Sequence, residues 1–98
     1  MPGAYGIAGE IGYWIVSGLE GRGLVTRAVR ALIDTGFGEL GFHRLVIRAG
    51  VDNDRSRAIP ERLGFTREAI ARGEGRGNGG FYDLVVYGLL EDEWPITT

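Results

Sequence analysis

Residues 18–29, "GLEGRGLVTRAV", place three glycines and one arginine directly before a run with helical spacing. The preceding stretch, residues 9–17, is apolar, aromatic and β-branched and is bounded by glycine, which predicts a buried strand. From Leu24 the apolar residues recur with a helical period as far as Leu40, and Gly41 is a suitable stop. This part of the chain therefore predicts a strand, a glycine-rich turn and a long amphipathic helix.

Two interpretations of the glycine-rich turn remain open. Glycine lets main-chain N–H groups approach a ligand closely, and the N-terminus of a helix attracts negative charge. The N–H groups from Gly21 to Thr26 would then cradle a phosphorylated group, with Arg22 as a charged companion. Alternatively, the turn only starts the helix. It lacks the Gly-Lys-Ser/Thr ending of a nucleoside triphosphate loop, which disfavours ATP and GTP as ligands.

The next segments predict a second strand and a second helix. Residues 43–51 alternate as a strand, so the strand–helix–strand order suggests a crossover between parallel strands. Asn53 is a suitable N-cap for a helix that ends near Gly64. Because Pro60 lies inside this helix and has no N–H, we expect the helix to be short or kinked.

The C-terminal third predicts a β-hairpin. Residues 65–71 and 81–90 read as strands, and residues 72–80, "RGEGRGNGG", read as a long glycine loop between them. This loop matches the dinucleotide fingerprint Gly-x-Gly-x-x-Gly, but that motif must open a helix and here a strand follows. The order β–α–β–α–β–β predicts a mixed-sheet α/β fold, with residues 1–98 as a single domain.

The composition excludes several functions. The net charge is −2, and all 11 basic residues are arginine, which argues against a nucleic-acid or membrane-surface partner. There is no cysteine and only one histidine, so we expect no disulfide, no thiol nucleophile and no metal site. Without a secretory pattern or a membrane-spanning apolar run, a cytoplasmic protein is expected.

Four stretches resemble, in order, the GNAT superfamily of acetyl-CoA-dependent N-acetyltransferases and its RimJ/RimL-like branch. They are "EIGYWI" (10–15), "EGRGLVTRAVRALIDTGF" (20–37), "VDNDRSRAIPERLGFTRE" (51–68) and "YDLVVYGLLEDEW" (82–94). Where the family carries Gln/Arg-x-x-Gly-x-Gly/Ala, this chain has Glu20-x-x-Gly23-x-Val25, so Glu20 departs from the pattern. GNAT domains normally begin with three further strands and two helices. The resemblance therefore implies the GNAT acyl-CoA N-acyltransferase fold, β–α–β–α–β–β, without those N-terminal elements.

The resemblance implies transfer of acetyl from acetyl-CoA to a primary amine, which attacks the thioester directly. The acceptor would be a protein N-terminus or a small amine. Because an alkylamine is mostly protonated at neutral pH, a general base helps. The resemblance makes Glu10 that base, acting through a water, and Ser56 the proton donor to the departing thiolate. Read without the resemblance, Glu10 is a solvent-facing strand residue and Ser56 a capping residue.

The resemblance also implies how acetyl-CoA binds. Main-chain N–H groups near Ile15 and Val16 would hold the thioester carbonyl. Asn53 would cap its helix and bond the pantetheine arm. Arg57, with Arg55, would approach the phosphates or lie on a solvated helix face. The full set of expected cofactor-binding residues is Ile15, Val16, Gly21, Arg22, Gly23, Leu24, Val25, Thr26, Asn53 and Arg57.

Two rival interpretations concern the missing acceptor half. The chain could be a non-catalytic acetyl-CoA-binding module, or a fragment that self-associates through residues 9–17, because an unpaired apolar strand edge tends to pair with another chain. We therefore expect a homo-oligomer. His43 is read as an ordinary surface or cap residue. Of Tyr82 and Tyr87, one should pack and the other be exposed, and Trp94 should anchor an acidic, solvated tail.

Overall fold

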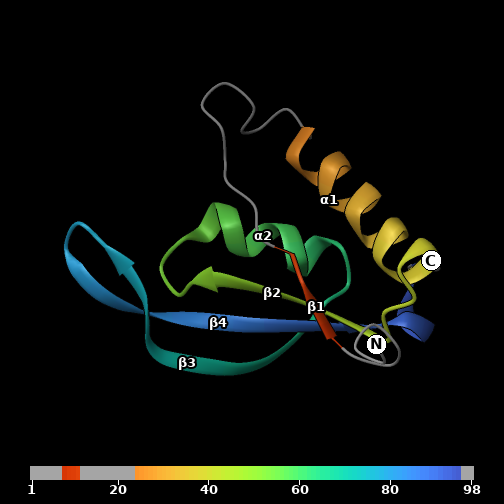
Figure 1. Ribbon diagram of the computed structural model, residues 1–98. Coiled ribbons are helices and arrows are strands. Elements are labelled where there is room, and N and C mark those ends of the chain that lie inside the picture. The colour runs from red at the N-terminus through yellow and green to blue at the C-terminus, as the bar shows by residue number, and fades with distance from the viewer. Residues whose placement is uncertain (1–7, 12–23, 96–98) are drawn as a thin grey trace.

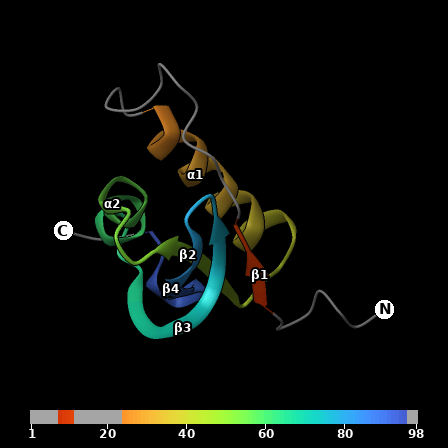
Figure 2. The ribbon, with the colours of Figure 1, turned by 90° about the vertical axis from the view of Figure 1, so that its left-hand side faces the viewer.

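The computed structural model describes residues 8–11 and 24–95. The elements are β1 (Ala8–Glu10), α1 (Leu24–Asp34), the π-helical turn η2 (Thr35–Glu39), β2 (Arg44–Gly50), α2 (Asp54–Arg62), β3 (Thr66–Gly77), β4 (Gly80–Leu90) and the short 3₁₀ helix η3 (Glu91–Glu93). The strands form one sheet in the order β1-β2-β4-β3, in which β1 and β2 are parallel and the other pairs antiparallel. Both helices lie on one face of this sheet (Figures 1 and 2). The predicted mixed α/β order is confirmed.

The core lies between the two helices and the odd-numbered side chains of the central strands. Successive side chains of a strand point to opposite faces of the sheet. The buried cluster therefore takes alternate residues from the strands and one face from each helix. Its members are Ile11, Val29, Ile33, Leu45, Ile47, Ala49, Ile59, Leu63, Phe65, Val85, Tyr87 and Leu89. This cluster holds α1 and α2 against β2 and β4.

The even-numbered residues of β2 reach the other face, which neither helix covers. There Arg44 Nη1 and Nη2 donate to the two carboxylate oxygens of Glu68, each at 2.7 Å. The pair crosses β4 at Gly88, where a Cβ would collide with both side chains. Arg48 forms a second set of ion pairs, with Glu74 and, at 3.6 Å, with Glu10. These ion pairs link β2 to both edge strands.

The hairpin differs from its prediction. The strand expected at residues 65–71 continues to Gly77, so the long glycine loop is wrong, and only residues 78 and 79 form the turn. Two register shifts absorb the extra residues of β3 as bulges. The Tyr82 ring lies where a Cβ of Gly75 would be, so glycine is what lets β3 pass beneath the ring. The glycines serve a bulged strand rather than a free loop.

The predictions for the helices are confirmed. The helix expected from Leu24 to Leu40 is α1 continued by η2, and the backbone after it takes a left-handed φ of 69° at Gly41. The second helix is short, as expected, with Pro60 buried inside it. Within the residues that the structure describes, neither helix is long and apolar enough to cross a bilayer.

The predictions for the two ends of the chain have different outcomes. Trp94 Nε1 donates to Asp34 Oδ1 at 2.8 Å and packs against the core, while residues 91–93 stay exposed, so the anchored acidic tail is confirmed. The first strand is described only over β1 and Ile11, whose N–H donates to the carbonyl oxygen of Val46 at 2.8 Å. The rest of the strand predicted at 9–17 lies outside the described residues.

The Arg44–Glu68 pair should make stability depend on pH. The hydrogen bond from Arg44 holds the pKa of Glu68 below its ordinary value of 4.5. A carboxylate with a depressed folded pKa contributes stability above its unfolded pKa, and this contribution is lost as pH falls through the folded pKa. We therefore expect Glu68→Gln to be less stable than wild type at pH 7, with the difference shrinking below about pH 4.5.

Urea unfolding at a series of pH values measures this difference, and the exposed Glu39 supplies a matched control, Glu39→Gln. A difference between wild type and Glu68→Gln that stays constant down to pH 3 would contradict the assignment of this acid sensitivity to the ion pair.

Candidate functional site

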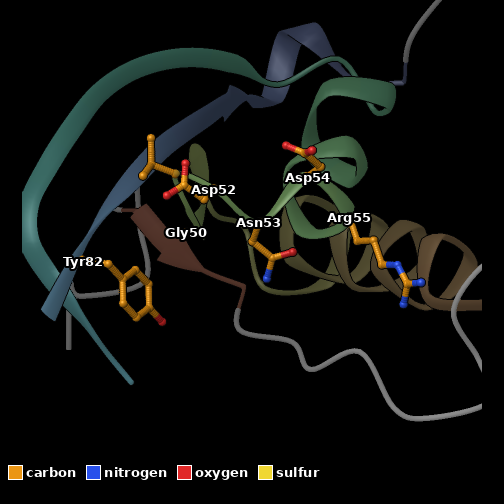
Figure 3. Close-up of a pocket in the computed structure, with 7 residues that line it drawn as sticks. Gly50, Asp52, Asn53, Asp54, Arg55 and Tyr82 are labelled. Atoms are coloured by element: carbon orange, nitrogen blue, oxygen red, sulfur yellow. The ribbon is translucent and has the colours of Figure 1, made fainter. Parts of the chain in front are cut away.

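A hollow of about 580 Å³ opens where β2 ends and α2 begins. It is lined by Gly50, Val51, Asp52, Asn53, Asp54, Arg55 and Tyr82. Figure 3 shows the Tyr82 ring on one side of the hollow and Asn53 on the other. The lining thus comes from the turn between β2 and α2 and from the first residues of β4. It is polar apart from Gly50, Val51 and the tyrosine ring.

Main-chain hydrogen bonds fix the turn that lines the hollow. The N–H of Val51 donates to the carbonyl oxygen of Asp83 on β4 at 2.9 Å, and the N–H of Asn53 donates to the Gly50 carbonyl at 2.9 Å. Asn53 Oδ1 accepts from the N–H of Ser56 at 3.1 Å, which confirms Asn53 as the N-cap of α2. Ser56 therefore lies in the first turn of α2 with its main chain held by Asn53.

Arg57 points into the protein rather than toward solvent. Its Nε donates to the Tyr87 hydroxyl at 3.0 Å, its Nη1 donates to the Val51 carbonyl at 3.0 Å, and its Nη2 lies 3.5 Å from Glu61 Oε2. Each of the three guanidinium nitrogen atoms therefore has a partner within the protein. The structure thus gives the charge of Arg57 internal partners, and the expected contact of Arg57 with cofactor phosphates stays a prediction.

The two tyrosines of β4 have the two environments expected of them. Tyr87 is 1% exposed and Tyr82 45% exposed. Burial raises the pKa of Tyr87, and its hydrogen bond to Glu61 adds to this increase, while Arg57 opposes it. The Tyr87 hydroxyl donates to Glu61 Oε2 at 2.6 Å. Tyr87 thus keeps its proton at neutral pH and is a poor acid for a reaction.

Glu10 is exposed on β1 and faces away from the helices, 3.6 Å from Arg48. It pairs with Val46 in the β1–β2 register, four residues before the hollow at Gly50 and roughly 13 Å along the strand. The structure brings Asn53 and Ser56 together, but it places Glu10 at a distance from them and on the opposite face of the sheet. His43 is exposed, as expected, with its Nδ1 3.3 Å from Glu91.

The expected phosphate site is only partly described. Ile15, Val16, Gly21, Arg22 and Gly23 lie outside the described residues. Leu24, Val25 and Thr26 form the first turn of α1, which contains no acidic residue. Arg62, at the end of α2, donates from Nη1 to Thr26 Oγ1 at 3.4 Å.

The sequence analysis missed the role of Tyr87 and its partner Glu61. Their contact joins residues 26 positions apart, so no local periodicity shows it. The sequence pattern that could have indicated part of this cluster is the spacing of Arg57 and Glu61. They are four residues apart, which places both on one face of the helix.

Comparison with known proteins identifies the family. Residues 2–66 match the model of the acetyltransferase (GNAT) domain. The chain belongs to the GNAT family. The hollow and the Asn53–Ser56 turn lie in residues 51–68, one of the four stretches that resemble the family. This stretch combines an asparagine, a serine three residues later and a closing Leu-Gly-Phe.

Three relatives are informative. The chain is 51% identical over 85 residues to the "Putative ribosomal N-acetyltransferase YdaF" of Bacillus subtilis (strain 168), covering 87% of this chain and 46% of that protein. It is 34% identical to the ribosomal-protein-serine acetyltransferase of Escherichia coli (strain K12), covering 85% and 46%. The structure of the microcin C7 self-immunity acetyltransferase MccE in complex with acetyl-CoA and AMP has a TM-score of 0.75 and 37% identity, covering 85% and 46%. The chain spans about half the length of the curated relatives that it matches.

The Asn53 cap makes a direct prediction. Asn53→Ala should lower the free energy of unfolding by about 1 kcal/mol, because the N–H of Ser56 loses its side-chain acceptor. Asn53→Ser restores an acceptor and should remain close to wild type. Urea unfolding of the three proteins measures this effect. Equal losses of stability in both variants would contradict the capping assignment, because serine also offers a capping oxygen but lacks the asparagine amide.

Proposed function

We propose that this chain binds acetyl-CoA and takes part in transferring the acetyl group to a primary amine. The observation that carries the proposal is the capped turn of Asn53 and Ser56 beside the hollow. Support comes from membership of the GNAT family and from MccE, a relative whose structure was solved with acetyl-CoA. We place the reaction in the cytoplasm, without a metal ion and without a nucleic-acid or membrane partner.

In the proposed reaction, the amine nitrogen attacks the thioester carbonyl carbon. A C–N bond forms, the C–S bond breaks and the thiolate leaves. Glu10 takes the proton that the amine loses, through a water molecule, and Ser56 gives a proton to the thiolate. Main-chain N–H groups near Ile15 and Val16 stabilise the negative charge that develops on the carbonyl oxygen.

The proposed binding of acetyl-CoA uses main-chain groups more than side chains. The N–H groups from Gly21 to Thr26, with Arg22, hold the diphosphate at the N-terminus of α1. Asn53 bonds the pantetheine arm while it caps α2. We leave Arg57 out of the proposed binding set, because its Nε and Nη1 already donate within the protein, and its contact with the phosphates stays a prediction.

The acceptor amine enters through the hollow. Asp52 and Asp54 line it and are exposed, so their carboxylates favour the approach of a cationic amine. The acceptor is a protein N-terminus or a small amine. Two relatives are named as ribosomal acetyltransferases, which favours the N-terminus.

A second candidate function is binding of acetyl-CoA without turnover, or association into a homo-oligomer through the first strand. The position of β1 at the edge of the described sheet favours such association, because an unpaired strand edge tends to pair with another chain.

Two measurements separate these functions. Calorimetric titration with acetyl-CoA reports binding, and release of free thiol with a panel of small amines and short peptides reports turnover. We expect binding with a dissociation constant in the micromolar to millimolar range and turnover with at least one amine. Binding without turnover supports a non-catalytic acetyl-CoA-binding chain, and no binding refutes both roles for acetyl-CoA and leaves only self-association.

Ser56→Ala and Glu10→Gln test the roles assigned to these residues. Each should lower kcat by about 10²-fold, because each removes a proton-transfer step. Glu39→Gln, an exposed carboxylate on η2, is the matched control and should leave kcat unchanged. Wild-type kcat in both site variants would discard the two assignments while leaving binding intact.

A further inference from the structure

A buried hydroxyl group on β4 is connected to the turn that lines the hollow. Tyr87 lies in the core, 1% exposed, and its ring packs with the apolar cluster. Its hydroxyl is the polar end of an otherwise apolar contact between β4 and α2. It donates to Glu61 at 2.6 Å and accepts from Arg57 Nε at 3.0 Å. Both of its hydrogen-bonding directions are therefore used by α2.

Arg57 carries this connection onward to the turn. Its Nη1 donates to the Val51 carbonyl at 3.0 Å, and its own N–H donates to the Asn53 carbonyl at 3.0 Å. The guanidinium group is planar and holds its N–H donors in a fixed fork, so a contact at Nε constrains the contact at Nη1. The Arg57 side chain thus joins the core of the sheet to the Val51 carbonyl, while its main chain bonds the Asn53 carbonyl.

The turn has few other means of holding its position. Asp52 and Asn53 are exposed, and Val51 is half-buried. Besides the contact of Arg57, the turn bonds the sheet from the Val51 N–H to the Asp83 carbonyl and from the Asn53 N–H to the Gly50 carbonyl, and Val51 packs against the core. The Arg57 fork adds a side-chain link between the turn and β4, and the Tyr87 hydroxyl group fixes the other end of that link.

We propose that Arg57 and Tyr87 are positioning residues, which hold Asn53 and Ser56 in the geometry needed for acetyl transfer. This inference rests on the proposed acetyltransferase function. Neither residue touches a reacting atom in the proposed reaction. They act through the turn, so they affect the rate of transfer more than the binding of acetyl-CoA, whose diphosphate is held at α1 in the proposed complex.

The pKa values of Arg57 and Tyr87 are both raised, so the two residues keep their protonation states and their hydrogen bonds near neutral pH. The hydrogen bond from Arg57 to Tyr87 is the largest cause of the raised pKa of Arg57, and burial is the largest cause of the raised pKa of Tyr87. The guanidinium group stays charged and the hydroxyl stays neutral across the neutral range. The pair therefore keeps the same hydrogen bonds across the neutral pH range.

Tyr87→Phe and Arg57→Lys test the proposal. Tyr87→Phe keeps the buried ring and removes only the hydroxyl, and Arg57→Lys keeps the charge and removes the fork. Both should lower kcat by about 10- to 100-fold, because a displacement of about 1 Å at the reacting groups has effects of this size. The KM for acetyl-CoA and its calorimetric dissociation constant should change less than kcat does, because the proposed diphosphate contact at α1 is retained and only the pantetheine contact of Asn53 is disturbed.

Arg44→Gln is the control for lost stability. It breaks the exposed ion pair with Glu68 on the helix-free face and should leave kcat unchanged. Urea unfolding of all variants shows whether activity follows stability. Wild-type kcat in Tyr87→Phe, or full activity in Arg57→Lys, would overturn the positioning role alone. A wild-type chain that neither binds acetyl-CoA nor acetylates an amine would overturn the proposed function, and this inference with it.

Discussion

The burial of alternate residues of β2 beneath the two helices is the constraint on which the rest of the structure depends. Leu45, Ile47 and Ala49 are buried against α1 and α2, so Arg44 and Arg48 must lie on the other face. Their charges have to be matched there, and they are matched from both sides of β2 by carboxylates of β1 and β3. A slip of one residue would bury two arginines and expose three core side chains.

The alternation of buried and exposed side chains ends with β2 at Gly50, and hydrogen bonds matter more in the turn that lines the hollow. Beyond β2 only Val51 still packs against the core, and the exposed Asp52 and Asn53 depend on hydrogen bonds within and around the turn. Burying the Tyr87 hydroxyl without hydrogen-bond partners would cost about 1–3 kcal/mol. Its hydrogen bonds with Glu61 and Arg57 offset this cost, and Arg57 in turn bonds the Val51 carbonyl at the rim of the hollow.

The sequence predicted what depends on neighbouring residues and failed where distant residues decide. The period of α1, the Asn53 cap and the order of elements are local, and the structure confirms them. The hairpin was predicted, but the length of its first strand was not, because β3 pairs with β4 through two bulges that no local pattern shows. The internal partners of Arg57 were missed because helical spacing indicates its helix face but not its partner, a tyrosine 30 residues away.

The positions of the proposed catalytic groups restrict where an amine can react. Glu10 faces the helix-free side, whereas Ser56 belongs to α2 on the covered side. An amine served by both can lie on neither face alone, so the proposed reaction places it at an edge of the sheet. The described pairing of β1 with β2 ends at Val46, and β2 continues to Gly50 at the hollow. The edge of β2 between these two residues is therefore where the proposed reaction would bring the amine and the thioester together.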